Sequence, residues 1–365
     1  MNVEILPLDK NSAEAFIKLP YFIYKDDTEF IPHIEQDIKD IFNSETNKYL
    51  RNGSCERWIA KKGDIVVGRI AAAIKQGEVQ GRIGFFECVD DKTIAKQLFS
   101  AAEQWLAAQG AKTAEAPVNF GGRDSFWGLM VGGFCRPSYR ENYNPVYYQS
   151  LIEYAGYSAE FRQITSEITP ATFNFERFSK LASRVLGNAE YEFKHLSFDK
   201  IDQFAEDFVY IYNKAWEKHE FFEPVNKKDI LKEMKSMKPI AQPQFNWFAY
   251  ANGEPAGFYL NVLDINQVFK KVNGKLNLIG KLKFLLGKHK IDRIRGIVFG
   301  VIPNHQNKGL ETGMIMKLYE EVVKIKTIKS SELSWIGDFN PKMQSLFNSL
   351  GAVTTKEHLT FKKLL

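Results

Sequence analysis

An anion-binding loop is the clearest chemical feature of the sequence, and it lies between Val301 and Leu310. An apolar strand is predicted to end at Val301, and an amphipathic helix is predicted to begin at Leu310. At such a junction free backbone N–H groups and the helix dipole attract a phosphate, and Gly309 lets the backbone approach a pyrophosphate closely. A plain strand-to-helix loop with a capping glycine is the alternative. The residues expected to hold a phosphate-bearing cofactor at this loop are Val301, Gln306, Asn307, Lys308, Gly309 and Leu310.

This loop resembles the acyl-CoA signature of the GNAT acyltransferase superfamily, which reads Gln/Arg-x-x-Gly-x-Gly/Ala after a strand that ends Val-x-Pro. The matching residues are Val301, Pro303, Gln306 and Gly309. Glu311, however, stands where the final small residue is expected, and a carboxylate near bound pyrophosphate is unfavourable unless it points away. The resemblance implies acyl-CoA or acetyl-CoA as co-substrate, and the departure at Glu311 leaves the choice between them open.

The segment 335–341 resembles the splayed fifth strand of that superfamily and the start of the helix that follows it. The resemblance implies that Asn340 helps to hold the pantetheine end of CoA. Many members carry a tyrosine farther along this helix, which protonates the departing thiolate, but this sequence has Phe347. A phenylalanine donates no proton, so the thiolate leaves unprotonated, uses water or finds another donor. Phe347 itself is expected to be a core residue.

Direct transfer of an acyl group to an amine needs a donor to the oxyanion, a base for the ammonium proton and a held thioester. The strand 297–301 should supply the oxyanion donor from its backbone, because its outer edge splays at the loop. The candidate bases are His219, Glu220 and Asp338, and His219 would titrate near neutrality. Each could equally be a solvated or capping residue. The sequence has no metal-ligand cluster and no nucleophile elbow, so we expect no metal and no hydrolytic chemistry.

Two parts of the sequence repeat each other, and the two copies supply the elements that position these residues. The segments 58–68 and 247–257 share Trp, Ala and a final Gly at the same spacing, and each predicts a β-hairpin. The segments 144–156 and 340–351 each predict a short helix that opens at Asn-Pro and ends before Gly. We therefore predict an α/β (α+β) fold of two tandem GNAT-like domains, each a mixed, mostly antiparallel central sheet flanked by helices.

The predicted domains are residues 1–168 and residues 169–365. The first-half junction corresponding to the loop carries Asp90 and Asp91 and no glycine. These carboxylates would occupy the helix N-terminus themselves. We therefore expect 1–168 to be a degenerate GNAT-like domain that binds no CoA, completes the fold and walls the acceptor cleft. Its glycine-rich stretch 120–140 is either part of that wall or a structural Ω-loop.

The segment 269–290 is a basic and apolar insert. Nine Lys or Arg residues and a single acid lie between positions 270 and 295. Apolar residues recur at helical spacing among the lysines, namely Leu278, Leu282, Leu285 and Leu286. Such a segment could lie on an anionic membrane, cover an acyl-chain tunnel with its apolar face, or pack on the sheet as a peripheral helix with a solvated basic edge.

Several further stretches resemble a mostly uncharacterised family of bacterial tandem-GNAT proteins, some of whose relatives are thought to be long-chain amine N-acyltransferases. They lie at 22–27, 67–70, 84–87, 143–148 and 283–288. The resemblance implies an acyl-CoA-dependent N-acyltransferase that transfers directly to a small-molecule or lipid amine, with a long-chain acyl or lipid-amine substrate as one option. A Fem-like aminoacyl-tRNA-dependent transferase, which alone would involve nucleic acid, is one alternative. A non-catalytic GNAT-like binding protein is the other.

Composition agrees with a globular chain of two domains. The 365 residues are 44% apolar and 25% charged, which is ordinary for a soluble protein of this size. No signal peptide or transmembrane segment is predicted, and three cysteines without a CxxC pair fit a reducing compartment. The expected location is the cytoplasm, with peripheral contact at the inner membrane surface through 269–290.

Overall fold

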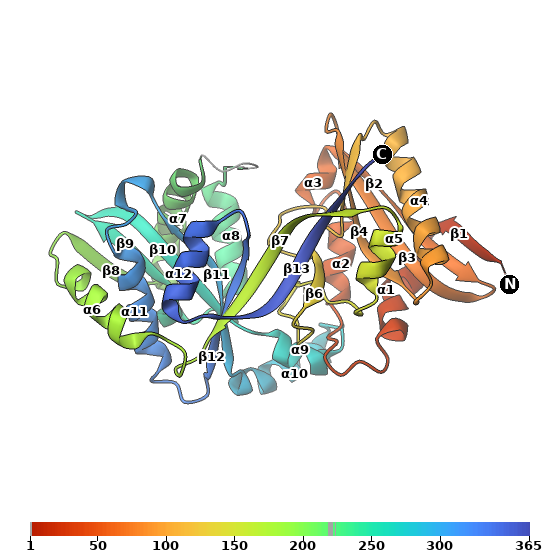
Figure 1. The fold of residues 1–365 in the computed structure, drawn as a ribbon. Coiled ribbons are helices and arrows are strands. Elements are labelled where there is room, and N and C mark those ends of the chain that lie inside the picture. The colour runs from red at the N-terminus through yellow and green to blue at the C-terminus, as the bar shows by residue number, and fades with distance from the viewer. Residues whose placement is uncertain (1, 218–221, 223) are drawn as a thin grey trace.

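The computed structural model describes residues 2–217, 222 and 224–365, and its strands form one continuous sheet (Figure 1). The strands of the first half are β1 (Val3–Pro7), β2 (Gly53–Lys62), β3 (Ile65–Lys75), β4 (Gln80–Cys88), β5 (Thr113–Ala116), β6 (Leu129–Gly132) and β7 (Ser158–Ile168). Those of the second half are β8 (Tyr191–His195), β9 (Trp247–Ala251), β10 (Glu254–Leu263), β11 (Arg293–Val301), β12 (Ser330–Gly337) and β13 (Val353–Leu364). Both predicted hairpins form, as β2–β3 and β9–β10.

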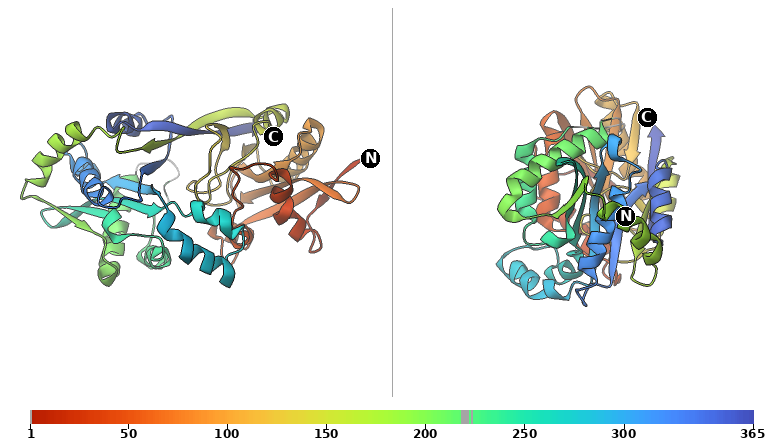
Figure 2. Two further views of the ribbon diagram at one scale, coloured as in Figure 1. Left: turned by 90° about the horizontal axis from the view of Figure 1, so that it is seen from below. Right: turned by 90° about the vertical axis from the view of Figure 1, so that its left-hand side faces the viewer.

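Helices cover both faces of the sheet in each half (Figure 2). They are α1 (Ala13–Ile23), α2 (Glu35–Ile41), α3 (Lys48–Arg51), α4 (Lys92–Ala108), α5 (Tyr148–Tyr154), α6 (Phe175–Leu186), α7 (Ile201–Trp216), α8 (Lys227–Met237), α9 (Asn266–Val272), α10 (Leu278–Gly287), α11 (Leu310–Val322) and α12 (Pro341–Leu350). In the second half α6, α11 and α12 share one face, and α7 and α8 cover the other. No helix in the described part of the chain is long and apolar enough to cross a membrane.

The two halves exchange their last strands, which the sequence did not predict. The hydrogen-bonded order is β1-β2-β3-β4-β5-β13-β7-β12-β11-β10-β9-β8, with β6 also paired to β13. Strand β7 of the first half pairs with β12, and the C-terminal strand β13 pairs with β5. In the described sheet β4–β5 and β11–β12 are parallel and the other pairings antiparallel. The predicted fold class is thus confirmed, and each half-sheet is completed by a strand from the other half.

A buried ionic cluster lies where the exchanged strands cross. The fully buried Lys356 of β13 bonds Glu332 of β12 at 2.8 Å and Glu141 of the first half at 2.5 Å. Burial by itself would raise the pKa of Glu332, but Lys356 and Arg293 outweigh burial and hold it below its ordinary value. Because Glu141 and Glu332 share one cation, the cluster links the two halves.

One predicted helix begins later than expected. The second-half copy, α12, opens at Pro341 with Asn340 as its N-cap. The first-half copy, α5, begins at Tyr148 instead of at Asn144-Pro145. Asn144 is buried, and its amide side chain bonds the backbone N–H and carbonyl of Met130 at 2.8 and 3.0 Å. This side-chain bridge holds the Asn-Pro segment in a turn before the helix starts.

Candidate functional site

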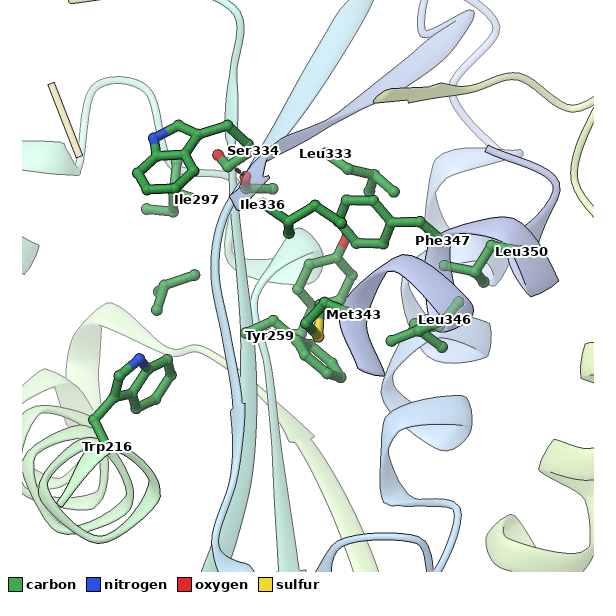
Figure 3. Close-up of a pocket in the computed structure, with 15 residues that line it drawn as sticks. Trp216, Tyr259, Ile297, Leu333, Ser334, Ile336, Met343, Leu346, Phe347 and Leu350 are labelled. Carbon is green, nitrogen blue, oxygen red and sulfur yellow. Dashed lines mark hydrogen bonds between the residues drawn. The ribbon is translucent and has the colours of Figure 1, made fainter. Parts of the chain in front are cut away.

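A cleft opens where the parallel strands β11 and β12 part. They pair from Arg293 to Gly296 and from Ser330 to Leu333, and no pairing between them is found beyond this in the described chain. An apolar cavity of about 220 Å³ lies at the opening (Figure 3). Its walls are residues 296–299 of β11, residues 333–336 of β12, Met343, Leu346, Phe347 and Leu350 of α12, and Trp216, Tyr259 and Ile315. The expected splay beside strand 297–301 is therefore present.

Two hydroxyl groups line this otherwise apolar cleft. Ser334 donates its hydroxyl proton to the Gly296 carbonyl. Tyr259 of β10 reaches the base of the opening, where a Cβ placed on Gly296 would lie 3.0 Å from the phenol oxygen. Burial raises the pKa of Tyr259 above its ordinary value, so the phenol remains protonated at neutral pH. Phe347, which cannot donate, lines the same cleft and is part of the core as expected (Figure 3).

The predicted anion loop follows β11 and leads directly into α11. The Gln306 amide Nε2 donates to the Val301 carbonyl at 3.0 Å, which folds the loop back on the strand end. Asn307 and Lys308 are exposed, whereas Leu310 is fully buried and fixes the helix start in the core. The backbone N–H groups in the first turn of a helix have no intrahelical partner. The loop therefore brings five predicted residues together around free amides, with Val301 at its base.

Gly309 is required by the shape of this loop. It is the N-cap of α11 with φ of 88°, a conformation that side-chain-bearing residues rarely adopt. A Cβ added here would lie 2.6 Å from Cγ2 of Val185 on α6. Both the backbone conformation and the packing of α6 thus disfavour a larger residue. Glu311, the departure from the family pattern, is half-buried in the first turn of α11.

The remaining predicted residues lie apart from the loop. Asn340 accepts the Met343 backbone N–H at 3.2 Å as the N-cap of α12, which walls the cleft. The Asp338 carboxylate accepts the Arg162 backbone N–H at 3.1 Å, so it extends the pairing of β12 with β7. His219 and Glu220 lie outside the described residues. Trp216, which precedes them, lines the far side of the cleft.

In the first half the corresponding opening is filled by the protein itself. Tyr148 accepts the Cys88 backbone N–H at 2.9 Å and donates to Glu87 at 2.7 Å. A Cβ on Gly84 would lie 2.1 Å from the Val118 carbonyl, so the chain crosses tightly over β4. At the helix start, Asp91 accepts the first N–H groups of α4, those of residues 93 and 94. The splay and the helix N-terminus are thus both occupied by the chain's own groups.

The glycine-rich stretch 120–140 packs between the halves. Its Tyr139 carbonyl accepts from Arg295 of β11 at 3.1 Å, and Tyr139 and Arg140 both bond Asp37. Just before them, the Pro137 carbonyl accepts from Asn266 of α9 at 2.8 Å. The stretch therefore forms part of the boundary between the halves.

Comparison with known proteins identifies the architecture. No family model matches the sequence. The bacterial ceramide synthase of Caulobacter vibrioides (strain NA1000 / CB15N) is 25% identical over 380 residues, covering 100% of this chain and 98% of that protein. Protein YghO of Escherichia coli (strain K12) is 24% identical over 371 residues, covering 98% and 94%.

Solved structures agree over the whole chain. A tandem GNAT protein from the clavulanic acid biosynthesis pathway superposes with a TM-score of 0.57 at 13% identity, covering 100% of this chain and 98% of that one. The chain has the tandem GNAT fold. A GCN5-related N-acetyltransferase from Sphaerobacter thermophilus gives a TM-score of 0.55 at 11% identity, covering 99% and 95%. The resemblance seen in the sequence is confirmed, and the comparisons support an acyltransferase.

Two features of the site escaped the sequence reasoning. No motif marks Tyr259, although Gly296, at the start of the apolar stretch that ends at Val301, signals a close approach by another group. No local pattern marks Trp216 as part of a site, yet its ring packs so closely on β11 that a Cβ on Gly300 would lie 2.5 Å from it. Contacts between elements that are distant in sequence create both features.

Proposed function

We propose that this chain is an acyl-CoA-dependent N-acyltransferase that moves an acyl group directly from a CoA thioester to an amine. The observation that carries the proposal is the continuity of β11, which borders the apolar cleft at 296–299 and ends at the Gly309 loop. A phosphate site and an apolar cleft joined by one strand suit a ligand with a pyrophosphate at one end and an apolar arm at the other. The closed opening in 1–168 supports one CoA site per chain, in 169–365.

The proposed roles follow from this arrangement. Backbone N–H groups at 307–310 receive the pyrophosphate. The pantetheine arm lies between β11 and β12 beside α12, where Asn340 fixes the helix start. The unpaired edge of β11 at 297–299 donates N–H groups to the thioester carbonyl oxygen, which becomes an oxyanion when the amine attacks. Lys308 adds positive charge at the phosphate end.

Proton transfer requires two groups. The amine nitrogen bonds to the thioester carbon, the C–S bond breaks, and the ammonium proton passes to a base. His219 and Glu220 are the preferred bases because Trp216, directly upstream, lines the cleft; Asp338 is less suited because its carboxylate already accepts a backbone N–H. Tyr259 would donate a proton to the departing thiolate, replacing the donor that Phe347 lacks.

The proposed acceptor is a lipid amine, and the proposed acyl group is a long chain. Among the residues that the structure describes, the lining of the cleft is apolar and suits a hydrocarbon. A cavity of about 220 Å³ is smaller than most ligand pockets, so a long chain would extend beyond it. The relative named bacterial ceramide synthase supports this substrate class.

A thermal-shift series tests the proposal against its rivals. CoA, acetyl-CoA, palmitoyl-CoA and an aminoacyl-tRNA are each added to the full chain, because a ligand that binds the folded state raises the melting temperature. We expect stabilisation by CoA that increases with acyl-chain length. Stabilisation by aminoacyl-tRNA alone would favour the Fem-like alternative. A CoA-induced shift without any amide product, for a range of amines, would favour the non-catalytic alternative.

A further inference from the structure

Helix α10 carries its apolar stripe on the outside of the molecule. The exposed fractions are 85% for Leu278, 66% for Ile279, 57% for Leu282, 55% for Leu285 and 64% for Leu286. At about 100° per residue these five side chains share one side of the helix. A helix on the surface of a globular protein normally turns such a stripe towards the core. The stripe, which we call the α10 leucine face, therefore needs an apolar partner outside the chain.

The orientation of α10 is fixed by its other side. Gly280, Phe284 and Gly287 lie at helical spacing and face α9: the Phe284 ring is 5.8 Å from that of Phe269, and a Cβ on Gly287 would lie 2.7 Å from Val268. A Cβ on Gly280 would lie 2.1 Å from the Lys275 carbonyl. The helix cannot roll to bury its leucines without losing these close contacts. The pair α9–α10 lies at the edge of the molecule (Figure 2).

Lysines border the α10 leucine face on both sides. On the same helical projection Lys281 and Lys288 flank one side, and Lys283 flanks the other. The surrounding segment adds further basic residues, and between positions 270 and 295 nine basic residues face one acid. A membrane surface with anionic lipids offers this combination, since acyl chains receive the leucines while headgroups pair with the lysines.

We infer that α10 is a membrane-docking helix that places the α10 leucine face in the interface of an anionic bilayer. A second copy of this chain fits less well, because an isologous contact through this face would bring the two lysine borders together. Helices α9 and α10 join β10 directly to β11, and both strands wall the cleft through Tyr259 and residues 296–299. Docking would thus hold the cleft strands next to the lipid phase. Only the benefit of docking, a cleft close to lipid substrates, rests on the proposed function. Membrane binding by α10 itself needs no CoA.

Vesicle co-sedimentation of the full chain without CoA tests the inference. Vesicles of phosphatidylcholine with about 30% phosphatidylglycerol are compared with pure phosphatidylcholine at low salt and at about 0.15 M salt, where exposed charges are screened beyond ~8 Å. We expect binding to the anionic vesicles that weakens with salt. The variant Leu282→Asp/Leu286→Asp should bind at least about tenfold more weakly, and Lys281→Glu/Lys283→Glu should lose about fivefold per lysine or more.

Matched controls use another exposed apolar residue and another exposed lysine. Ile65, which is 61% exposed at the β2–β3 turn, is changed to Asp, and Lys62 in the same hairpin is changed to Glu. Both controls should bind vesicles like the unchanged chain, and all variants should keep its melting temperature within a few degrees.

Three results would overturn the inference: no binding to anionic vesicles, equal binding by the leucine variant, or a dimer in solution that the leucine variant abolishes. Stabilisation by acyl-CoA is measured separately on the same proteins. A docking failure with intact CoA binding is therefore distinguishable from a failure of the proposed function.

Discussion

Replacing Gly309 by alanine is the sharpest perturbation of the proposed CoA loop. Residue 309 has φ of 88°, and a residue with a Cβ loses roughly 1–2 kcal/mol in this left-handed conformation. The new methyl would also lie 2.6 Å from Cγ2 of Val185. Val185 is β-branched and stiff about χ1, so relief requires the loop or α6 to move, at about 1–3 kcal/mol.

The clash with Val185 is specific to Gly309, whereas the cost of the left-handed conformation is not. Gly253, in the β9–β10 turn, has φ of 84° and no atom within 4 Å of its virtual Cβ. Gly253→Ala therefore carries the conformational penalty without the clash. If CoA binds only the native loop conformation, part of the packing cost in Gly309→Ala is subtracted from the free energy of CoA binding. A loss of about 1.4 kcal/mol raises the dissociation constant tenfold. We expect the dissociation constant for CoA to rise about tenfold in Gly309→Ala and to stay unchanged in Gly253→Ala.

Isothermal titration with CoA on both variants measures this difference. The double variant Gly309→Ala/Val185→Ala removes the clashing methyl and should recover most of the lost affinity, although Val185 is a core residue and the fold will be less stable. The reasoning is refuted if Gly309→Ala binds CoA as tightly as the unchanged chain. It is refuted equally if Gly253→Ala weakens binding to the same extent.

Four further outcomes are expected. Tyr259→Phe should lower kcat about 100-fold with little change in KM for acyl-CoA, and unchanged steady-state kinetics would exclude Tyr259 as the thiolate donor. Lys356→Met removes the buried cation that Glu141 and Glu332 share, although Arg293 and Arg295 still pair with Glu332, and it should lower the free energy of unfolding by about 3–5 kcal/mol; an unshifted urea midpoint would contradict the linking role of the cluster. Because the folded-state pKa of Glu332 is depressed, its stabilisation is present above the ordinary Glu pKa of about 4.3 and is lost as pH falls below it, so melting temperatures should decline there, and Glu332→Gln should flatten this decline. Tyr148→Phe should leave CoA affinity within about twofold, since a larger loss would place CoA in the first half.

Local sequence patterns predicted much of the fold. The hairpins, the helix that begins at Leu310 and the loop before Gly309 depend on turn residues, apolar periodicity and a strand-to-helix junction. These signals lie within short stretches of sequence. The sequence repeat predicted the tandem arrangement of two GNAT-like domains. Asn340 is the N-cap of α12, as the Asn-Pro pair indicates. In the first half, the predicted helix start at Asn144-Pro145 is wrong because Asn144 bonds Met130, fourteen residues away.

The features that were missed all depend on long-range pairing. The strands β7 and β13 read as ordinary last strands of their halves, and nothing local distinguishes pairing within a half from exchange between halves. Lys356 stands among polar neighbours in β13, such as Thr355 and Glu357. Its burial follows only once Glu332 and Glu141 are brought to it. Tyr259 likewise gains its place at the cleft from the opening of β11 and β12. The predicted domain boundary between residues 168 and 169 stays a prediction.

Product analysis tests the central claim most directly. The full chain is incubated with palmitoyl-CoA and a long-chain amino alcohol, and the amide and free CoA are measured together by mass spectrometry. The proposed function predicts amide and CoA in equal amounts. At limiting palmitoyl-CoA, formation should fall about tenfold in Gly309→Ala and be retained in Gly253→Ala. Absence of amide with every acyl-CoA and amine tried, from a chain that still binds CoA, would contradict it.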